Sequence, residues 1–196
     1  MSSPATQTES AVARQAMVDS QLRPQGVTDP QVLAAMGSVE RERYVPETAR
    51  ALAYSDRSIP LGDGRSLPPP AALGVLLDGI RPMAGERALV IGAGTGYSSA
   101  VLEAMGLQVT AIQGARTLEA AGPVDVILID GAVEFIPEEL VAQLADGGRL
   151  GGALLEGGVA RLILGRKAGD AFGYYAVGDA GVSPLPGFTR PPAFVF

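Results

Sequence analysis

The 196 residues include no cysteine and no histidine, and these two absences narrow the chemistry open to the protein. Without cysteine there can be no disulfide, no thiolate nucleophile and no cysteine-ligated zinc. Without histidine the commonest general base and metal ligand is gone, and a Ser-His-Asp mechanism is excluded. We expect no metal site. Chemistry must rest on carboxylates, lysine, tyrosine, hydroxyls or the positioning of a reactive cofactor.

Basic residues and long apolar runs are also scarce. The chain has 15 Lys and Arg against 21 Asp and Glu, which gives a formal net charge of −6. Binding to nucleic acid or to an anionic membrane requires clustered basic residues, so we expect neither partner. No apolar run is long enough to span a bilayer. The length fits one domain, and we expect it in the cytoplasm.

The stretch from Arg87 to Tyr97 reads Arg-Ala-Leu-Val-Ile-Gly-Ala-Gly-Thr-Gly-Tyr. Its apolar run is typical of a strand buried in a parallel sheet, and the glycines that follow permit a tight turn close to a ligand. A helix over 98–105 would direct its N-terminal amides at that ligand. The spacing G-x-G-x-G favours S-adenosylmethionine over a nicotinamide cofactor, which takes G-x-G-x-x-G. A turn kept for packing alone is the alternative.

Predicted helices and strands alternate along the rest of the chain. We expect helices at 10–22, 30–36, 47–52, 70–80, 98–105 and 137–144, and an extended connection at 43–46. We expect strands at 87–91, 109–112, 124–130, 149–155, 159–164, 172–177 and 193–196. This order predicts a doubly wound α/β sheet, mostly parallel, with an antiparallel C-terminal edge and an N-terminal helical layer.

Several motifs, in order, resemble protein-L-isoaspartate O-methyltransferases. They are Gln21-Leu22-Arg23, Gly26-Val27, Asp29, Val32-Leu33, Ala35-Met36, Val39, Tyr44-Val45-Pro46, the run from Ala53 to Gly64, and the glycine loop at 92–97. The resemblance implies a single Rossmann-like methyltransferase domain, with 1–80 as a helical, substrate-side layer and 81–196 as the core. It also implies transfer of a methyl group from S-adenosylmethionine to a carboxylate of an isoaspartyl residue in a damaged protein.

The same resemblance implies the substrate-side residues. The family's loop Gly-x-Gly-Gln-Thr-Ile-Ser-x-Pro aligns with residues 62–70. Ser66 matches the threonine and can offer a hydroxyl, and Arg65 replaces the glutamine and can pair with a carboxylate in a bidentate way. We therefore take Ser66 and Arg65 as candidate catalytic residues. The alternative is that Ser66 is a turn residue and Arg65 a solvated charge. Pro68 stands where the family has its serine.

On the cofactor side the resemblance implies seven residues: Gly92, Ala93, Gly94, Gly96, Tyr97, Gln113 and Asp130. Gln113 aligns with the family's ribose-binding glutamate. An amide offers one acceptor oxygen and no charge, so we expect the free energy of cofactor binding to be less favourable by about 1–3 kcal/mol than with the glutamate. Asp130 is the last residue of the predicted strand 124–130, at the edge where ligands bind in open α/β sheets, although a strand-end aspartate can instead cap the next helix.

The connection between two predicted strands is too short for the family's pattern. Eleven residues, 113–123, separate Ile112 from Val124, whereas a helix and a strand with their connections need about thirty. One βα unit is therefore shortened or missing. Together with Pro68 and Gln113, this supports a second hypothesis, a catalytically degenerate methyltransferase fold that acts as a binding module.

The C-terminal residues 186–196 are rich in proline and aromatic side chains. We expect an edge strand that covers the sheet. Edge strands with exposed apolar residues also invite pairing with another chain, so a homodimer is the alternative use of this segment.

Overall fold

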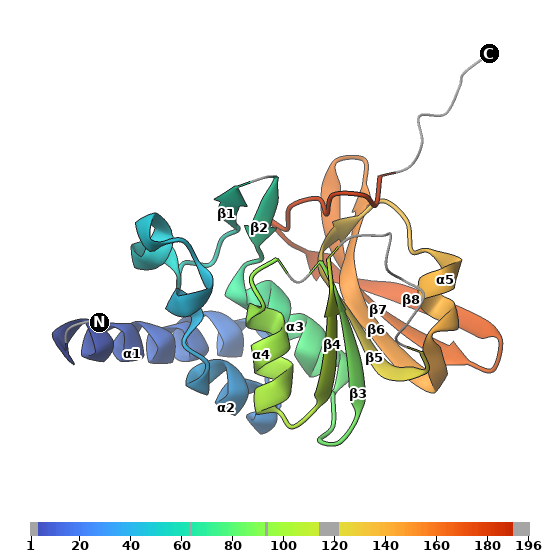
Figure 1. Cartoon of the computed structure of the whole chain (residues 1–196), viewed down its shortest axis with the longest axis horizontal. Helices are drawn as coiled ribbons and strands as arrows, with labels where there is room; N and C mark the ends of the chain where they lie inside the picture. The colour runs from blue at the N-terminus through green and yellow to red at the C-terminus, as the bar shows by residue number, and fades with distance from the viewer. Residues whose placement is uncertain (1–3, 63, 93, 114–121, 190–196) are drawn as a thin grey trace, which may run out of the picture.

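The computed structural model describes residues 4–62, 64–92, 94–113 and 122–189. A six-stranded sheet forms its centre, with the strand order β4-β3-β5-β6-β7-β8 (Figure 1). The strands are β3 (Arg87–Ile91), β4 (Gln108–Ile112), β5 (Val124–Val133), β6 (Leu144–Glu156), β7 (Val159–Ala168) and β8 (Ala171–Asp179). β3 is parallel to β4 and β5, and β5 to β6, whereas β7 and β8 are antiparallel to their neighbours. The predicted sheet is confirmed.

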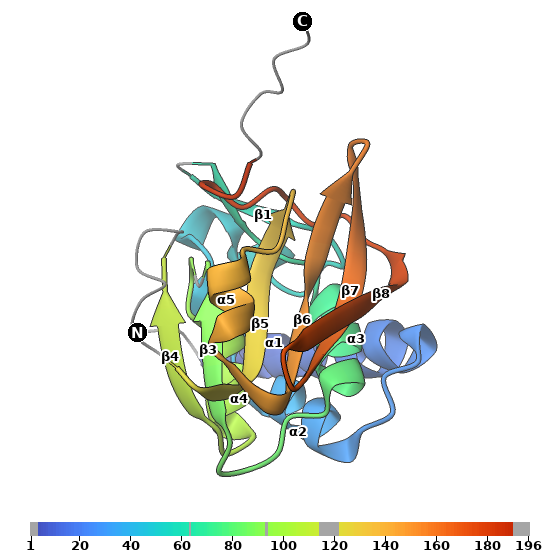
Figure 2. The same cartoon turned by 90° about the vertical axis from the view of Figure 1, so that its right-hand side faces the viewer.

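Helices lie on both sides of this sheet, but unequally (Figure 2). One side carries α1 (Pro4–Met17), α2 (Pro30–Ser38), α3 (Pro70–Ile80) and α4 (Tyr97–Ala104). The other side carries α5 (Glu138–Ala142). Short π and 3-10 turns occupy Val18–Leu22, Arg23–Gln25, Arg41–Tyr44 and Glu47–Leu52. Above the first layer, β1 (Ile59–Gly62) pairs antiparallel with β2 (Arg65–Leu67).

Alternating strand residues divide the core into two apolar clusters, because successive side chains point to opposite faces of a sheet. Val90 and Leu128 pack with the helices of the first layer. Leu89 and Ile127 pack on the α5 side, together with Leu140 of that helix. The glycine turn after β3 therefore lies between two differently built faces.

Local signals in the sequence placed several element boundaries correctly, although three strands extend well beyond their predicted ends: β5 continues to Val133, β6 begins at Leu144 and β7 continues to Ala168. The Asp29 side chain accepts a hydrogen bond of 2.8 Å from the Gln31 amide and so caps α2, with Pro30 in the first turn. In α3, the apolar stripe that includes Leu73 and Leu77 is buried. The hairpin turn at Gly157 and Gly158, both with positive φ, links β6 to β7 as predicted.

Some predicted boundaries were wrong. The first helix begins at Pro4, not at Ser10, because proline is accepted in the first helical turn and the residues after it are compatible with helix. A 3-10 turn reaches Tyr44 where an extended connection was expected. Helix α5 ends at Ala142, since β6 already begins at Leu144. The predicted strand 193–196 lies outside the described residues.

The shortened connection leaves β4 at the edge of the sheet. Each residue of β4 pairs with β3, from Gln108 opposite Arg87 to Ile112 opposite Ile91. Among the described residues no strand pairs with the outer side of β4. In the same ranges no helix is long and apolar enough to cross a membrane, and no group of three acidic residues is placed to hold a metal ion.

Candidate cofactor and substrate site

The glycine turn lies at the carboxyl end of β3 and leads into α4 (Figure 1). Gly92 and Gly96 have φ angles of 80° and 82°, in the left-handed region that favours glycine. The Gly92 amide donates a hydrogen bond of 2.9 Å to the carbonyl oxygen of Ile112. The turn therefore starts level with the end of β4, at the edge where ligands bind in open α/β sheets.

The second half of the turn organises the start of α4. The Gly94 amide donates to the carbonyl oxygen of Gly92 at 2.5 Å. The Thr95 hydroxyl oxygen accepts a hydrogen bond of 3.2 Å from the amide of Tyr97, the first helical residue. The N-terminal end of α4, with its positive partial charge, thus faces the same edge. The predicted cofactor residue Ala93 lies outside the described residues.

Gly92 is in close contact with a side chain that the sequence did not point to. A Cβ atom at Gly92 would lie 2.4 Å from Cδ1 of Leu185. Leu185 is held there by backbone: its amide donates to the Ala132 carbonyl at 2.7 Å, and the Ala132 amide donates to the Ser183 carbonyl at 2.9 Å. Packing against the protein's own C-terminal segment therefore explains this glycine.

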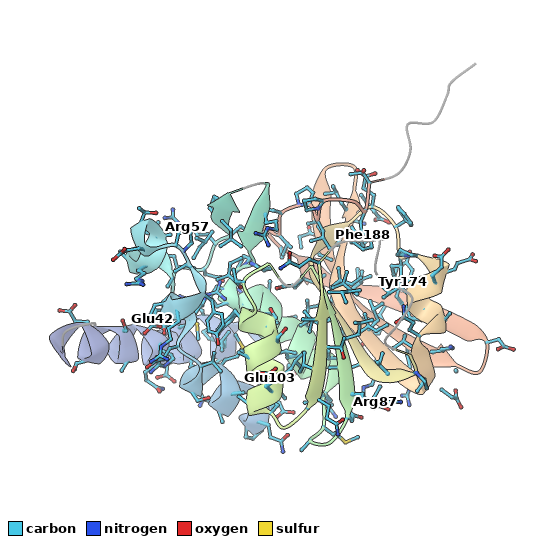
Figure 3. All side chains as sticks on the ribbon, viewed as in Figure 1. Glu42, Arg57, Arg87, Glu103, Tyr174 and Phe188 are labelled. Atoms are coloured by element: carbon cyan, nitrogen blue, oxygen red, sulfur yellow. The ribbon has the colours of Figure 1, made fainter. Side chains whose placement is uncertain are left out.

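We call residues 180–189 the C-terminal strap. It continues from β8 along the end of β5 and finishes on the α5 side of the sheet, where Phe188 is buried (Figure 3). The Phe188 carbonyl accepts a 3.0 Å hydrogen bond from the Glu134 amide. At its other end, the Ser58 hydroxyl donates to the Gly181 carbonyl at 2.6 Å. The strap therefore joins the substrate-side layer to the sheet.

Both candidate catalytic residues lie on β2. The Arg65 guanidinium donates a 3.2 Å hydrogen bond from Nη1 to the carbonyl oxygen of Gly94. Arg65 is thus engaged with the glycine turn, which is evidence against a simply solvated charge. Ser66 is half-buried and pairs with Pro60 of β1 in the hairpin ladder. The structure thus brings Arg65 to the cofactor turn. The Ser66 side chain makes no hydrogen bond to the described residues of that turn.

Asp130 is buried beside the start of α4, at 7% exposure. Its carboxylate accepts a 2.9 Å hydrogen bond from the Ser98 hydroxyl. Burial raises the pKa of Asp130 to about 6, against the lowering effects of that hydrogen bond and of the Arg41 charge. Asp130 does not cap the next helix, since α5 begins only at Glu138.

Tyr97 points inward, not toward the edge of the sheet, and is fully buried. Its ring meets the Tyr44 ring edge-on at a centroid distance of 5.6 Å. The guanidinium carbon of Arg41 lies 4.7 Å from the centre of the Tyr97 ring. Burial raises the pKa of the Tyr97 hydroxyl. Tyr97 thus anchors the glycine turn to the helical layer.

Arg41 is a site residue that sequence reasoning missed. It lies in the charged run Glu40-Arg41-Glu42-Arg43, which is typical of a solvated surface. Yet its side chain is 0% exposed, and burial lowers the pKa of its guanidinium. No local pattern distinguishes it from Arg43, because its burial results from contacts with residues far along the chain.

Gln113 follows directly after β4, and its side chain is exposed. Ile112, the residue before it, bonds to the Gly92 amide, so Gln113 lies next to the glycine turn at the carboxyl edge. The residue that aligns with the family's ribose-binding glutamate therefore lies at the same edge as the glycine turn, and its role in binding ribose stays a prediction. It carries an amide in place of a carboxylate.

Two cavities of very different size lie in different parts of the described structure. A cavity of about 800 Å³ lies between α1 and the segment 40–55, and none of the predicted site residues within the described ranges lines it. A cavity of about 10 Å³, room for about one water molecule, is lined by Pro68, Asp130 and Gly131 among others. We base the site on the glycine turn and not on either cavity, because Arg65 bonds to that turn and Asp130, which lines the second cavity, bonds to Ser98 in the first turn of α4.

The glycines differ in the room that they leave for a ligand. A Cβ at Gly94 would make ordinary contacts of 3.5 Å with Arg65 and Leu61, and one at Gly96 would lie 3.9 Å from Tyr44. Gly92, in contrast, is already packed. Gly94, Gly96, the N-terminus of α4 and Gln113 therefore fit a nucleoside-containing cofactor better than Gly92 does.

Comparisons with known proteins match this arrangement. The family model described as Protein-L-isoaspartate(D-aspartate) O-methyltransferase (PCMT) matches residues 12–112 and 102–154. The two matches overlap at 102–112, as expected for a chain with one βα unit fewer than the model. Protein-L-isoaspartate O-methyltransferase 1 of Rhodopseudomonas palustris is 35% identical over 170 residues, which is 73% of this chain and 69% of that protein.

A second relative covers more of the chain. Protein-L-isoaspartate O-methyltransferase of Methylorubrum extorquens is 35% identical over 202 residues, 89% of each chain. A crystal structure of a protein-L-isoaspartate O-methyltransferase from Plasmodium falciparum, in complex with S-adenosyl-L-homocysteine, has a TM-score of 0.73 at 18% identity. It covers 88% of this chain and 97% of that one, and it shows the shared fold. The chain belongs to the protein-L-isoaspartate(D-aspartate) O-methyltransferase family.

Proposed function

We propose that the protein transfers a methyl group from S-adenosylmethionine to a carboxylate of isoaspartyl residues in damaged proteins. Family membership supplies the reaction. The single observation that carries it for this chain is the hydrogen bond from Arg65 to the Gly94 carbonyl. It joins the segment that resembles the family's substrate loop to the turn that resembles its cofactor loop.

We assign the substrate carboxylate to Arg65 and Ser66. A guanidinium has five donors in a fixed fork that matches the geometry of a carboxylate, and Arg65 lies beside the Gly94 carbonyl of the cofactor turn. The Ser66 hydroxyl can donate one further hydrogen bond. Pro68, at the family's serine position, has neither a hydroxyl nor an amide proton to offer.

We assign the cofactor to the turn at Gly94 and Gly96, the amides at the start of α4 and the exposed amide of Gln113, with Gly92, Ala93, Tyr97 and Asp130 completing the set. When bound, S-adenosylmethionine supplies an electrophilic methyl group on a positively charged sulfur. Asp130 supports the turn through its hydrogen bond with Ser98, and Tyr97 supports it through its contact with Arg41.

The reaction makes little demand on acid–base chemistry, which suits a chain without histidine. A substrate carboxylate is already ionised near neutral pH and needs no base to become a nucleophile. The protein's part is to align that carboxylate and to exclude water from the line of attack, a contribution of positioning. Arg65 does both if its guanidinium closes over the carboxylate.

Calorimetric titration with S-adenosylhomocysteine tests the cofactor assignment. We expect micromolar binding by the wild type and none by Gly94→Val, whose side chain would occupy the turn. Gly173→Val on β8 is the matched control: neither glycine has a positive φ, and nothing lies within 4 Å of a Cβ there. Transfer of labelled methyl to an isoaspartyl peptide, but not to its aspartyl counterpart, then tests the reaction.

A catalytically degenerate binding module is the second candidate. It is favoured by Pro68, by the contact of Leu185 with Gly92 and by the short connection 113–123. No heat with millimolar S-adenosylhomocysteine, from protein that is folded, would select this candidate.

We further propose that residues 1–80 and 81–196 are the substrate-side and cofactor-side parts of one domain. We place it in the cytoplasm, where S-adenosylmethionine is available. Of the C-terminal residues 186–196 that suggested a homodimer, 190–196 lie outside the described residues, and Phe188 is buried in the strap. We also propose a homodimer, which is supported by the edge strand β8, where Tyr174 and Tyr175 are 50% and 64% exposed. Light scattering tests the dimer, and fractionation tests the compartment.

A further inference from the structure

We propose that Arg41 is a positioning residue that clamps both ends of the substrate-side segment 53–68 and ties them to the cofactor turn. The inference rests on the proposed function for its kinetic consequences, but its structural part stands on the contacts of one guanidinium. No substrate or cofactor atom needs to touch Arg41 for it to act.

The clamp consists of two hydrogen bonds. Arg41 Nε donates to the carbonyl oxygen of Ala53 at 2.7 Å, and Nη2 donates to that of Pro68 at 2.5 Å. Ala53 and Pro68 are the two ends of the segment that carries β1, β2 and both candidate catalytic residues. One side chain thus closes the whole segment at its base.

The link to the cofactor turn is the contact with Tyr97. The guanidinium lies over the ring of this first residue of α4. Asp130, which accepts the Ser98 hydrogen bond one residue further on, attracts the same guanidinium. Arg41 therefore holds the substrate-side segment against the first turn of α4, which fixes the position of that segment relative to the cofactor turn.

The burial of this charge needs an explanation that general stability does not give. A guanidinium removed from water requires hydrogen bonds and charge compensation to be tolerated. Within the described residues neither Arg41 Nη1 nor the Tyr97 hydroxyl makes a hydrogen bond of good geometry. The favourable interaction between these two groups offsets only part of the cost of burial, which still lowers the pKa of Arg41. An apolar side chain would fill the same place at lower cost, but it could not hold two carbonyl groups at once.

Only a fork of donors can make these contacts together. A lysine ammonium is a single point charge and can reach one of the two carbonyl groups well. Arg41→Lys therefore keeps the charge and breaks the clamp. Arg43→Met is the control, because the Arg43 side chain is 73% exposed and, within the described part of the chain, its ion pair is with nearby Glu40.

Hydrogen exchange tests the clamp without any activity. In Arg41→Lys we expect amide exchange within 59–67 to accelerate about tenfold or more, while the strands of the sheet keep their protection. Arg43→Met should exchange like the wild type. Unchanged exchange in 59–67 of folded Arg41→Lys would overturn the proposal.

Kinetics then separate positioning from mere support of the fold. We expect Arg41→Lys to lower kcat/KM for an isoaspartyl peptide about tenfold or more, mainly through KM, with less than threefold change in the Kd of S-adenosylhomocysteine. Two outcomes in a folded variant would contradict a role in placing the substrate segment. In the first, kcat/KM and the affinity for S-adenosylhomocysteine fall equally; in the second, neither changes. A wild type without methyl transfer would instead refute the proposed function and leave the exchange test standing.

A second variant covers the case in which Arg41→Lys does not fold. Tyr97→Leu removes the ring beneath the guanidinium and leaves both carbonyl bonds possible. If the clamp is tied to the cofactor turn, exchange in 59–67 accelerates in this variant too, about threefold or more. Faster exchange in α4 alone, without any change in 59–67, would overturn the link between the cofactor turn and the substrate-side segment.

Discussion

The two faces of the sheet are closed in different ways. The face toward α1–α4 includes buried polar groups, and the four that the described residues provide are Arg41, Ser98, Ser99 and Asp130. The face toward α5 is apolar, and its cover is one short helix and the C-terminal strap with Leu185 and Phe188. One face thus supplies positioned polar groups, and the other supplies close packing against the same glycine turn.

The largest effect should come from opening the apolar face. Phe188→Ala removes a ring that is 1% exposed, and we expect a loss of about 3–5 kcal/mol in unfolding free energy. Leu102→Ala in α4 gives the matching measurement on the polar face, about 2–5 kcal/mol. Denaturant titration compares them. A loss below about 1 kcal/mol for Phe188→Ala would mean that the strap is a loose cover.

The contact between Leu185 and Gly92 should show as an energetic coupling. Gly92→Ala places a Cβ against Leu185 and strains a positive φ, which should cost about 2–4 kcal/mol. Leu185→Ala makes room, so in the double variant the coupling should recover about 1–2 kcal/mol. If denaturant titrations show that the two losses simply add, then Leu185 and Gly92 are energetically independent and the predicted coupling is wrong.

Asp130 makes the polar face sensitive to pH. Folding raises its pKa from 3.8 to about 6, so the folded state binds this proton more tightly than the unfolded state does. Its contribution to stability is therefore greatest below pH 4 and is lost as the pH rises through 6, by about 2–3 kcal/mol. Asp130→Asn should flatten the stability profile between pH 4 and 6, and an unchanged slope would contradict the assignment.

The smallest expected effect concerns the cofactor edge between the two faces. Gln113→Glu introduces a carboxylate at the position that we propose binds the ribose, and we expect S-adenosylhomocysteine to bind about tenfold more tightly, roughly 1.4 kcal/mol. Gln108→Glu, at the opposite end of β4 and also exposed, is the control. Calorimetry that finds both variants equal to the wild type would remove Gln113 from the site.

Local patterns were sufficient to predict much of the fold. The apolar run, the three glycines and the helix after them all lie within a few residues of one another, so β3, the turn and α4 follow from short-range rules. The capping of α2 by Asp29 is equally local. The short spacing between Ile112 and Val124 correctly left no room for a full βα unit.

Contacts between distant residues could not be read from the sequence. Arg41 lies in a charged run, and its burial depends on the carbonyl groups of Ala53 and Pro68 and on the ring of Tyr97. Gly92 has the pattern of a ligand-binding glycine, whereas Leu185 is what a Cβ there would meet. Such pairings depend on tertiary packing, for which periodicity offers no signal.

The strap also has a consequence for synthesis on the ribosome. It follows the six described strands of the sheet in the chain, so a growing polypeptide can assemble the helical layer and β3–β8 before Leu185 and Phe188 have emerged. Until then the apolar side chains beside α5 stay open to water and to other nascent chains, the condition in which aggregation starts. Slow synthesis of the strap should therefore favour capture by chaperones, and a stalled chain that lacks residues 180–189 should be a preferred target for proteolysis.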